Sequence, residues 1–326
     1  MGLQALLEVL ADGEFHSGES LGEAQGVSRA AIWKQLKKLE ELGLDCHSVK
    51  GRGYRIPGGI NLLKLAEFES QLNASAASCL TDITLALTLG STNKLAVEQA
   101  QQGDCHGRLY IAEQQTAGRG RRGRQWASPF ARNLYFSLTW SFSGGAAALE
   151  GLSLVVGLAL LNGLAEEGID GVQLKWPNDL LHNGRKLAGV LLEMSGDASG
   201  QCQVVIGVGV NVAMPETAAA DVDQPWTDLQ QIVARPVDRN RVLARLVNAL
   251  VDALQLFERQ GFAPFREAWQ QHNAHQGARV RLSTERFSEQ GECVGVDATG
   301  ALLLKTEQGV KAFHGGELSL RPLDDS

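Results

Sequence analysis

Nine consecutive residues, Gly118 to Trp126, combine three glycines with four arginines and are the stretch of the chain best suited to chemistry. The spacing Gly118-x-Gly120-x-x-Gly123 matches a dinucleotide-binding loop, a motif that requires a helix directly after it. Here Pro129 follows instead, and residues 133–140 alternate like a strand. The sequence therefore predicts a glycine-rich loop between two strands.

This arginine loop, residues 118–126, has the composition of an anion-binding segment. Glycines allow backbone N–H groups to approach phosphate oxygens, and the four arginines add cations. Four like charges in nine residues repel one another, so we expect the loop to be mobile when empty and to fold over an anionic ligand. A solvated basic turn without a ligand is the alternative.

A second polar constellation spans residues 175–193, KWPNDLLHNGRKLAGVLLE. A strand ends at Trp176, where Pro177 keeps the backbone extended. The pair Asn183-Gly184 is a hairpin-turn signal, so Lys186 begins the returning strand with its ammonium group near the strand end. A surface lysine beside a tight turn would give the same local pattern.

Two further motifs indicate where ligands would lie. Asn178 and Asp179 carry oxygens of the kind that bind magnesium on a nucleotide. The segment IGVGVN, residues 206–211, places Gly207 and Gly209 on one face of a strand, where the absent side chains leave room for a flat ligand.

These residues favour one reaction class over others. The sequence lacks the G-x-x-x-x-G-K-[ST] phosphate loop, the H-E-x-x-H zinc helix and the G-x-S-x-G nucleophile elbow. Cations and backbone donors without an attacking side chain suit a reaction between two bound substrates, such as a carboxylate attacking the α-phosphate of ATP. In that reaction the protein aligns the substrates and stabilises the spreading negative charge.

Length and composition limit the class and compartment of the protein. The 326 residues can form two or three domains, and a formal charge of -7 with a pI near 5.6 argues against a generally cationic nucleic-acid binder. The five cysteines are far apart and lack C-x-x-C spacing, as expected in a reducing interior. The longest apolar run, residues 151–161, is too short to cross a bilayer, so we expect a cytoplasmic protein without a membrane partner.

The first sixty residues predict a helix-turn-helix followed by a wing. Leucines at helical spacing give a first helix before Gly13, and a second helix covers about residues 17–25 and ends at Gly26. Ser28 is a good N-cap for a third helix from Arg29 to Leu42. In this fold the helix after the turn enters the major groove of DNA. The segment LDCHSVKGRGYRI then predicts two short strands around a basic turn.

Basic and acidic residues lie in separate segments of this unit, and the basic segment is suited to contact DNA. Residues 28–55 hold seven Lys or Arg against three acids, whereas residues 8–23 hold five acids and no Lys or Arg. A solvated amphipathic helix is the alternative, but the basic turn favours phosphate contacts beside a groove-reading helix. Trp33 is unusual on this polar face; we expect it to pack against the wing and assign it no base contact. The expected DNA contacts are Ser28, Arg29, Lys34, Lys37, Lys50 and Arg52.

The rest of the chain predicts an α+β region and a small β-barrel. Proline and paired glycines near residues 57–63 mark a boundary, beyond which hairpin links favour a mixed sheet with helices on one side. The expected strands are 83–89, 109–115, 133–140, 172–176, 186–193 and 203–212, and the expected helices are 93–102, 148–167 and 239–259. Five short strand candidates fill the last fifty residues. The expected domains are residues 1–60, 61–272 and 273–326.

Five motifs occur in the order in which one known family carries them: GSTN at 90–93, QQTAGRGRRGRQW at 114–126, KWPND at 175–179, RKLAG at 185–189 and IGVGVN at 206–211. On these motifs the chain resembles the bifunctional biotin protein ligases and biotin operon repressors, over almost its whole length. The resemblance implies a winged helix-turn-helix, a central mixed sheet like that of class II aminoacyl-tRNA synthetases, and a C-terminal SH3-like β-barrel.

The resemblance also implies a two-step reaction and a regulatory role. In the first step biotin and MgATP form biotinyl-5'-AMP, and in the second the biotin passes to one lysine of the biotin carboxyl carrier protein of acetyl-CoA carboxylase. The adenylate-bound protein is expected to form a homodimer, bind biotin operator DNA and repress the biotin biosynthesis genes. The alternatives are a ligase whose winged helix no longer regulates transcription, a non-catalytic biotin-sensing repressor and a lipoate ligase, although the Arg-Arg-x-Ser-Gly-Gly-Gly signature of lipoate ligases is absent.

Residue roles carry over by position from the matching motifs. The resemblance implies catalytic roles for Lys186, Arg119 and Arg121. It places biotin against Ser91, Thr92, Asn93, Gln115, Gly118, Arg119, Gly120, Arg121, Lys186, Gly189 and Gly207. It places ATP against Arg121, Trp126, Lys175, Asn178, Asp179 and Arg321, with Asn178 and Asp179 reaching Mg2+ through the nucleotide. One departure is Gly90, where the family usually has Asp; a carboxylate there would be expected to support the pocket or the arginine loop, and this chain lacks it.

Overall fold

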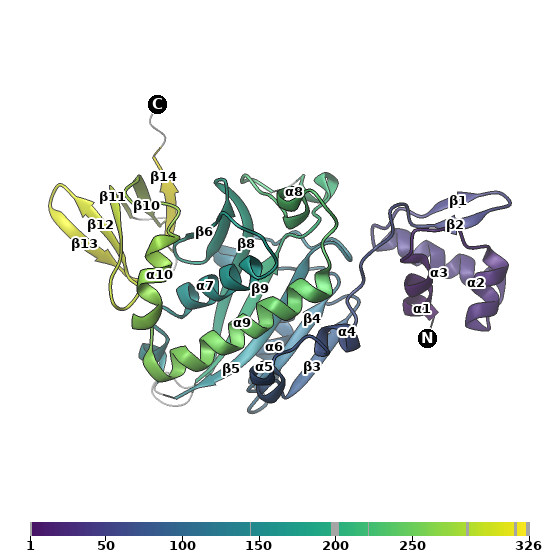
Figure 1. Ribbon diagram of the computed structural model, residues 1–326, viewed down its shortest axis with the longest axis horizontal. Coiled ribbons are helices and arrows are strands. Elements are labelled where there is room, and N and C mark those ends of the chain that lie inside the picture. The colour runs from purple at the N-terminus through teal and green to yellow at the C-terminus, as the bar shows by residue number, and fades with distance from the viewer. Residues whose placement is uncertain are drawn as a thin grey trace.

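The computed structural model describes residues 2–143, 145–196, 202–220, 222–284, 287–315 and 318–323. Within these ranges the strands form three sheets, of two, seven and five strands. Figure 1 shows the N-terminal helices and the two-stranded sheet at one end of the molecule, the large sheet in the middle and the C-terminal sheet at the other end. The predicted order of a helix-turn-helix, a mixed sheet and a C-terminal β unit is confirmed. The boundaries after residues 60 and 272 stay predictions.

Serine caps and a left-handed glycine give the N-terminal unit its helix-turn-helix. The unit consists of α1 (Gly2–Leu10), α2 (Gly18–Gln25), α3 (Arg29–Glu41), β1 (His47–Val49) and β2 (Gly53–Arg55). The Ser17 and Ser28 hydroxyls accept hydrogen bonds from backbone N–H groups in the first turns of α2 and α3. Gly26, at φ 65°, ends α2 in a conformation that costs glycine little. The helix-turn-helix and the wing are therefore confirmed.

The central sheet mixes parallel and antiparallel pairing. Its strands are β3 (Asp82–Ala86), β4 (Arg108–Ala112), β5 (Leu134–Phe142), β6 (Val172–Lys175), β7 (Asp179–His182), β8 (Arg185–Gly196) and β9 (Cys202–Val210). They run in the order β3-β4-β5-β9-β8-β7-β6; β3 and β4 are parallel, and the other neighbours are antiparallel. Asn183 and Gly184 join β7 to β8 with φ of 50° and 73°, as a type I′ hairpin turn requires. The predicted hairpin is confirmed.

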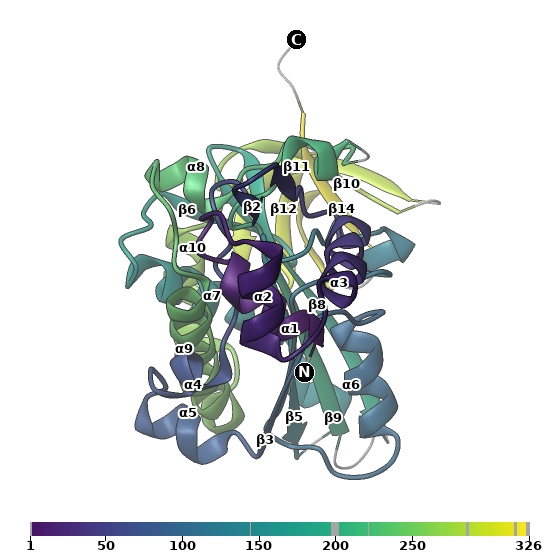
Figure 2. The same cartoon turned by 90° about the vertical axis from the view of Figure 1, so that its right-hand side faces the viewer.

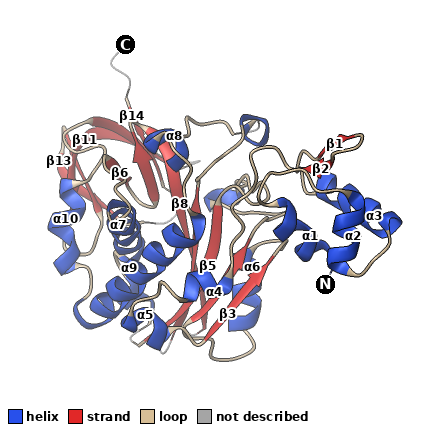
Figure 3. Cartoon of the chain, turned by 45° about the vertical axis from the view of Figure 1, so that its right-hand side comes forward, coloured by secondary structure: helices blue, strands red, loops and turns tan. Residues whose placement is uncertain are grey.

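Helices cover both faces of this sheet. The helices of this region are α4 (Leu65–Glu69), α5 (Ala74–Cys79), α6 (Thr92–Ala100), α7 (Leu152–Ala165), α8 (Leu229–Val233), α9 (Arg239–Gln260) and α10 (Arg266–Gln271). Leu134, Phe136 and Leu138 of β5 are buried in the apolar core beneath α7 and α9, whereas Ser137 faces α6. Figure 2 and Figure 3 show α6 on the opposite side of the sheet from α7 and α9. The prediction of helices on one side only is wrong, because the polar alternate positions of β5 also receive a helix.

The C-terminal sheet is antiparallel and ordered β13-β12-β11-β10-β14. Its strands are β10 (Arg279–Ser283), β11 (Ser288–Val296), β12 (Leu302–Thr306), β13 (Gly309–Phe313) and β14 (Ser319–Pro322), so the five predicted strands are confirmed. Trp176 Nε1 donates to the Gly300 carbonyl at 3.1 Å and ties this sheet to the end of β6. Pairing of β13 with β14 is not seen in the described ranges, and closure into an SH3-like barrel stays a prediction.

No helix within the described ranges is both long enough and apolar enough to span a membrane. The five cysteines are free thiols.

A buried ion pair joins the linker after the N-terminal unit to β4 and α9. Arg239, the first residue of α9, lies 2.6 Å from Glu113 Oε2, and the two side chains are 2% and 1% exposed. Arg239 also donates to the carbonyl oxygens of Asn61 and Asn133, and Glu113 Oε1 accepts from the Leu63 N–H at 2.6 Å. Both charges are thus satisfied inside the protein, and they fix the linker where β4 ends.

Replacing one partner of this pair should destabilise the protein strongly. In Glu113→Gln the Arg239 cation stays buried without a counter-charge, and we expect a loss of about 3–5 kcal/mol in the free energy of unfolding. Urea denaturation followed by circular dichroism measures it. The control Glu166→Gln breaks an exposed pair with Arg245, 3.3 Å apart, and should cost under about 1 kcal/mol. Equal losses in the two variants would contradict the role given to Glu113.

Candidate active site

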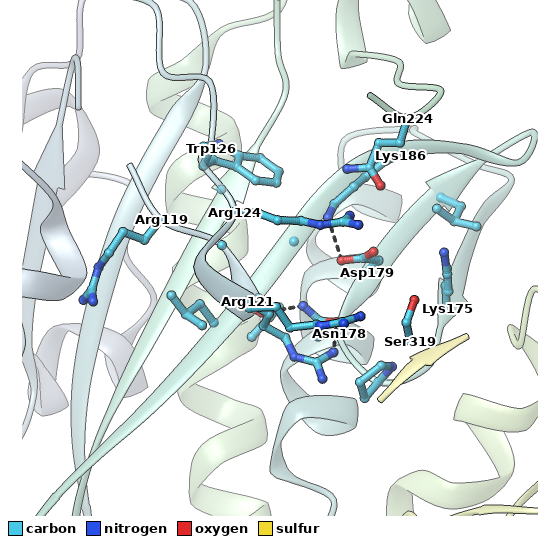
Figure 4. Close-up of a pocket in the computed structure, with 18 of the residues that line it drawn as sticks. Arg119, Arg121, Arg124, Trp126, Lys175, Asn178, Asp179, Lys186, Gln224 and Ser319 are labelled. Atoms are coloured by element: carbon cyan, nitrogen blue, oxygen red, sulfur yellow. Dashed lines mark hydrogen bonds and ion pairs between the residues drawn. The ribbon is translucent and has the colours of Figure 1, made fainter. Parts of the chain in front are cut away.

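One cavity of about 480 Å³ gathers the residues that the sequence motifs singled out. It lies between the start of α6, the arginine loop, strands β6 to β9 and strand β14 of the C-terminal sheet. Figure 4 shows its cationic part. The predicted residues that line it are Ser91, Thr92, Asn93, Gln115, Arg119, Gly120, Arg121, Trp126, Lys175, Asn178, Asp179, Lys186, Gly189, Gly207 and Arg321. Gly118 is the one predicted pocket residue outside this lining.

Gly189, Gly207 and Gly209 line one wall of the cavity without side chains, and we call this wall the glycine floor. Gly189 lies opposite Gly209 on neighbouring strands, and Gly207 lies two residues along. A Cβ atom on Gly209 would lie 2.5 Å from Trp126 Cε2, and one on Gly207 would overlap Asn93 Oδ1. The room predicted above Gly207 and Gly209 therefore exists, but the Trp126 indole and the Asn93 amide take up part of it.

The start of α6 presents a fixed row of hydrogen-bonding groups. The Ser91 hydroxyl caps the helix. Gln115 Oε1 accepts from Thr92 N at 2.9 Å and from Thr92 Oγ1 at 3.2 Å. Ser137 Oγ lies 2.6 Å from Asn93 Oδ1 and 2.8 Å from Thr92 Oγ1. These bonds orient the Thr92 and Asn93 side chains toward the cavity before a ligand arrives.

Gly90, the departure from the family pattern, pairs through its backbone with the residues before the arginine loop. Its carbonyl accepts from the Ala117 N–H at 2.8 Å, and the Leu89 carbonyl accepts from the Thr116 N–H at 2.9 Å. A Cβ atom on Gly90 would meet no other residue within 4 Å. Backbone pairing therefore joins this segment to the residues just before the arginine loop.

Lys186 lies at the start of β8, as predicted, and meets a carboxylate. Its Nζ lies 2.8 Å from Asp179 Oδ1, and the side chains are 16% and 15% exposed. The same Nζ lies 5.3 Å from the centre of the Trp126 ring. Backbone bonds of 2.9 Å with Pro225 and Thr227 hold Lys186 in place. A firmly positioned ammonium group, paired with one carboxylate, therefore lines the cavity.

Arg121 links the arginine loop to the opposite wall of the cavity. It donates to Asn178 Oδ1 at 2.7 Å and to the Leu318 carbonyl at 3.3 Å. Arg321 on β14 lines the same space, so the C-terminal sheet closes one side of the site. Asn178 follows the Trp176–Pro177 peptide bond, which is cis; the sequence predicted an extended chain there but not this isomer.

The cations of this cavity crowd one another. Burial lowers the pKa of Lys175, and Asp179 opposes that effect. Three nearby cations lower the same pKa further: Lys186, Arg321 and Arg124. Burial, together with Lys175, lowers the pKa of His275 to about 4, so this imidazole is neutral at pH 7. The site therefore carries positive charge that a polyanion would stabilise.

Asn178 and Asp179 do not form a ready metal site. An oxygen of each already faces a cation of the protein, Arg121 or Lys186. Across the described part of the chain, no three His, Cys, Asp or Glu side chains are grouped so that they could hold a metal ion. A role for these two residues toward magnesium on a nucleotide requires both contacts to rearrange.

Glu193 is a site residue that sequence reasoning missed. Arg119 Nη2 donates to both of its carboxylate oxygens, at 3.1 and 3.0 Å, and Asn93 Nδ2 donates to Oε2 at 2.9 Å. One carboxylate therefore holds the arginine loop and the Asn93 amide together. Figure 4 shows Arg119 pointing away from Arg121 and Arg124. Its guanidinium therefore lies apart from the other cations of the cavity. For Glu193, an acid that directly follows the apolar run of residues 187–192 was the signal that could have revealed it.

The predicted DNA contacts lie apart from this cavity. Every one of them is exposed on the N-terminal unit: Ser28, Arg29, Lys34, Lys37, Lys50 and Arg52. The Arg52 guanidinium lies 4.2 Å from the centre of the Phe15 ring, a cation–π contact that supports one side of the wing.

Comparison with known proteins places these features in one family. The sequence matches the profile of the biotin/lipoate A/B protein ligase family over residues 86–211, an HTH domain over residues 3–55 and the biotin protein ligase C terminal domain over residues 275–321. It is 41% identical over 319 residues to the bifunctional ligase/repressor BirA of Escherichia coli (strain K12), which covers 97% of this chain and 96% of the relative. The chain belongs to the biotin protein ligase family.

Other biotin protein ligases agree with this assignment. The bifunctional ligase/repressor BirA of Bacillus subtilis (strain 168) is 30% identical over 314 residues, 95% of each chain. The solved biotin protein ligase from Aquifex aeolicus in complex with biotin and ATP is similar with a TM-score of 0.63 and 29% identity, over 75% of this chain and 100% of that one. The similarity to the two bifunctional relatives thus includes the helix-turn-helix as well as the catalytic region.

Loss of the Glu193 carboxylate should release the arginine loop. Trypsin cleaves after arginine, so the rate of cleavage within residues 118–126 reports how often the loop opens. Glu193→Gln removes a partly exposed ion pair, and we expect cleavage there to be about two- to five-fold faster, measured by mass spectrometry of the fragments. Glu289→Gln, which breaks a pair of similar exposure with Lys311, is the control and should leave that rate unchanged. Identical loop cleavage in the two variants would refute the role given to Glu193.

Proposed function

We propose that this protein joins biotin to ATP, forms biotinyl-5'-AMP and passes the biotin to a lysine of the biotin carboxyl carrier protein of acetyl-CoA carboxylase. Similarity to bifunctional ligase/repressors over almost the whole chain supports the proposal. The observation that carries it is one cavity in which neutral hydrogen-bonding groups lie beside a cluster of cations. Biotin matches that division, because it has a neutral ring system at one end and a carboxylate at the other.

Biotin would lie between the start of α6 and the glycine floor, with its carboxylate toward Lys186. Its ureido ring carries two N–H donors and one carbonyl acceptor, and these need partners in a buried site. Thr92 and Gln115 offer such groups at fixed positions. The missing side chain at Gly207 permits close approach to the strand. The arginine loop would close over the bound ligand, with Gly118 and Gly120 giving access to backbone N–H groups.

Adenylate formation requires charge stabilisation rather than a protein nucleophile. A carboxylate oxygen of biotin attacks the α-phosphorus of ATP, a new O–P bond forms, and the bond to pyrophosphate breaks. Negative charge spreads over the phosphate oxygens, where Lys186 and Arg121 would act. Lys186 must exchange Asp179 for a substrate oxygen, so Asp179 holds the ammonium group in place until the substrates arrive.

The remaining cations and Trp126 would serve the nucleotide. Lys175 and Arg321 lie on the side of the cavity formed by β6 and β14, where the triphosphate would find both charges. Magnesium would enter with ATP and neutralise part of the phosphate charge. Asn178 and Asp179 have the oxygen atoms to reach that ion once their present partners are displaced.

The carrier protein supplies the nucleophile of the second step. The neutral ε-amino group of its lysine attacks the biotinyl carbonyl carbon and an amide bond forms, while AMP leaves with the electron pair of the broken C–O bond and the nitrogen loses one proton to solvent. The cations that stabilise the first transition state would also stabilise the departing phosphate of AMP.

The N-terminal unit gives the same protein a role in transcription. The adenylate-bound form would be a homodimer that presents two copies of α3 to paired half-sites of biotin operator DNA. The exposed cations of α3 and the wing support this part of the proposal. The C-terminal sheet would be an SH3-like barrel that positions Arg321 beside the nucleotide.

Lys186→Ala should slow adenylate formation by about 100- to 1,000-fold, because one preorganised charge of this kind contributes about 3–4 kcal/mol to the transition state. Biotin-dependent exchange of labelled pyrophosphate into ATP measures this step alone. Lys64→Ala removes an exposed ammonium group that pairs with Glu67 and should leave the rate unchanged. An undiminished rate in Lys186→Ala would overturn the role of this residue.

Mass spectrometry of the acceptor domain of a biotin carboxyl carrier protein, incubated with this protein, biotin and MgATP, tests the complete reaction. We expect one biotin on one lysine. If the wild-type protein gave neither pyrophosphate exchange nor a modified lysine while still binding biotin, a non-catalytic biotin-sensing repressor would be the correct assignment.

A further inference from the structure

Trp33 is a large apolar side chain on the solvent-facing side of α3. The helix buries Ile32, Leu36 and Leu39, whereas Trp33 is 51% exposed. Its ring lies beneath Lys37, with Nζ 4.1 Å from the ring centre. The wing therefore leaves about half of this side chain open to solvent.

Cations surround this ring along the helix. Arg29 lies four residues before Trp33 and Lys37 four residues after it, spacings that place all three on one side of a helix. Lys34 is adjacent and also exposed. The apolar Trp33 ring therefore has a positive charge on each side of it along the helix, from Arg29 and from Lys37. A matching partner must offer an apolar spot between negative groups.

Duplex DNA offers that combination in its major groove. Thymine projects a C5-methyl group into the groove, and phosphates line both edges. In a helix-turn-helix the N-terminal part of the second helix contacts the base edges. Trp33 is the fifth residue of α3, within that part, whereas Lys34 and Lys37 are placed to reach phosphates.

We propose that Trp33 is a specificity-determining residue that reads a thymine methyl group in the major groove. The proposal rests on the DNA-binding part of the function proposed above. Phosphate contacts by the neighbouring lysines bind any duplex, so they cannot choose a sequence. The methyl contact is different, because removing either the ring or the methyl group removes the same interaction. A protein partner, such as a second copy of this chain, would instead bury the ring without regard to the DNA sequence.

The test uses the full-length protein with biotin and MgATP and duplexes selected from a random-sequence library. In the best-bound duplex each thymine is replaced in turn by deoxyuridine, which lacks only the methyl group. For wild type we expect one replacement to weaken binding about three- to five-fold, the size of one buried methyl group. Trp33→Gln should bind the thymine and deoxyuridine duplexes equally, and Trp33→Phe should keep part of the difference. Pyrophosphate exchange by each variant confirms that the rest of the protein is intact.

The outcomes separate this inference from the function on which it rests. A wild-type protein that selects no sequence would overturn both. If wild type selects a sequence but Trp33→Gln keeps the full deoxyuridine effect, Trp33 does not read the methyl group and the DNA-binding function stands. If Trp33→Gln lost binding to all duplexes equally, and by as much as Lys37→Ala, the ring would only position Lys37 for a phosphate contact. Loss of dimerisation in Trp33→Gln, measured by sedimentation, would assign the ring to a protein interface.

Discussion

Positive charge is concentrated inside one cavity, and the contacts around the cavity hold the charged side chains in place. Arg121, Lys175, Lys186 and Arg321 line a space of about 480 Å³, where burial lowers the pKa of Lys175 and the neighbouring Lys186, Arg321 and Arg124 lower it further. Such a cluster persists only where the backbone and the neighbouring side chains hold each group. The repulsion among these cations favours binding of an anionic substrate, because the negative charge of a bound polyphosphate reduces that repulsion.

The scaffold holds these charges through contacts that are distant in sequence. Glu113 and Arg239 fix the residues just before the arginine loop, and Glu193 holds the loop itself through Arg119. On the far side of the loop, Phe130 and Ala131 pack into the apolar core of the N-terminal unit. The arginine loop is therefore anchored to the catalytic sheet at one end and to the DNA-binding unit at the other. A change in the loop on ligand binding has a short physical route to the helix-turn-helix.

The sequence predicted what depends on neighbouring residues and missed what depends on long-range contacts. The Ser28 cap, the Asn183-Gly184 turn and the position of Lys186 at a strand start follow from local chemistry, and the structure has all three. The partner of Glu193 is 74 residues away, and that of Glu113 is 126 residues away, so no local pattern reveals either pair. The placement of α6 on the second face of the sheet was not predicted for the same reason, because that placement depends on which strands become neighbours.

Proton uptake on nucleotide binding would report on the cations that surround Lys175 in the cavity. Burial and neighbouring cations lower the pKa of Lys175 below the ordinary value of about 10.4, and a bound triphosphate should raise it again. Between about pH 8 and pH 10 ATP is already fully ionised, so uptake would come from the protein. Calorimetry of ATP binding in two buffers of different ionisation enthalpy should show net proton uptake by wild type that is lost in Lys175→Met. Binding heats for wild type that are the same in both buffers would contradict the account.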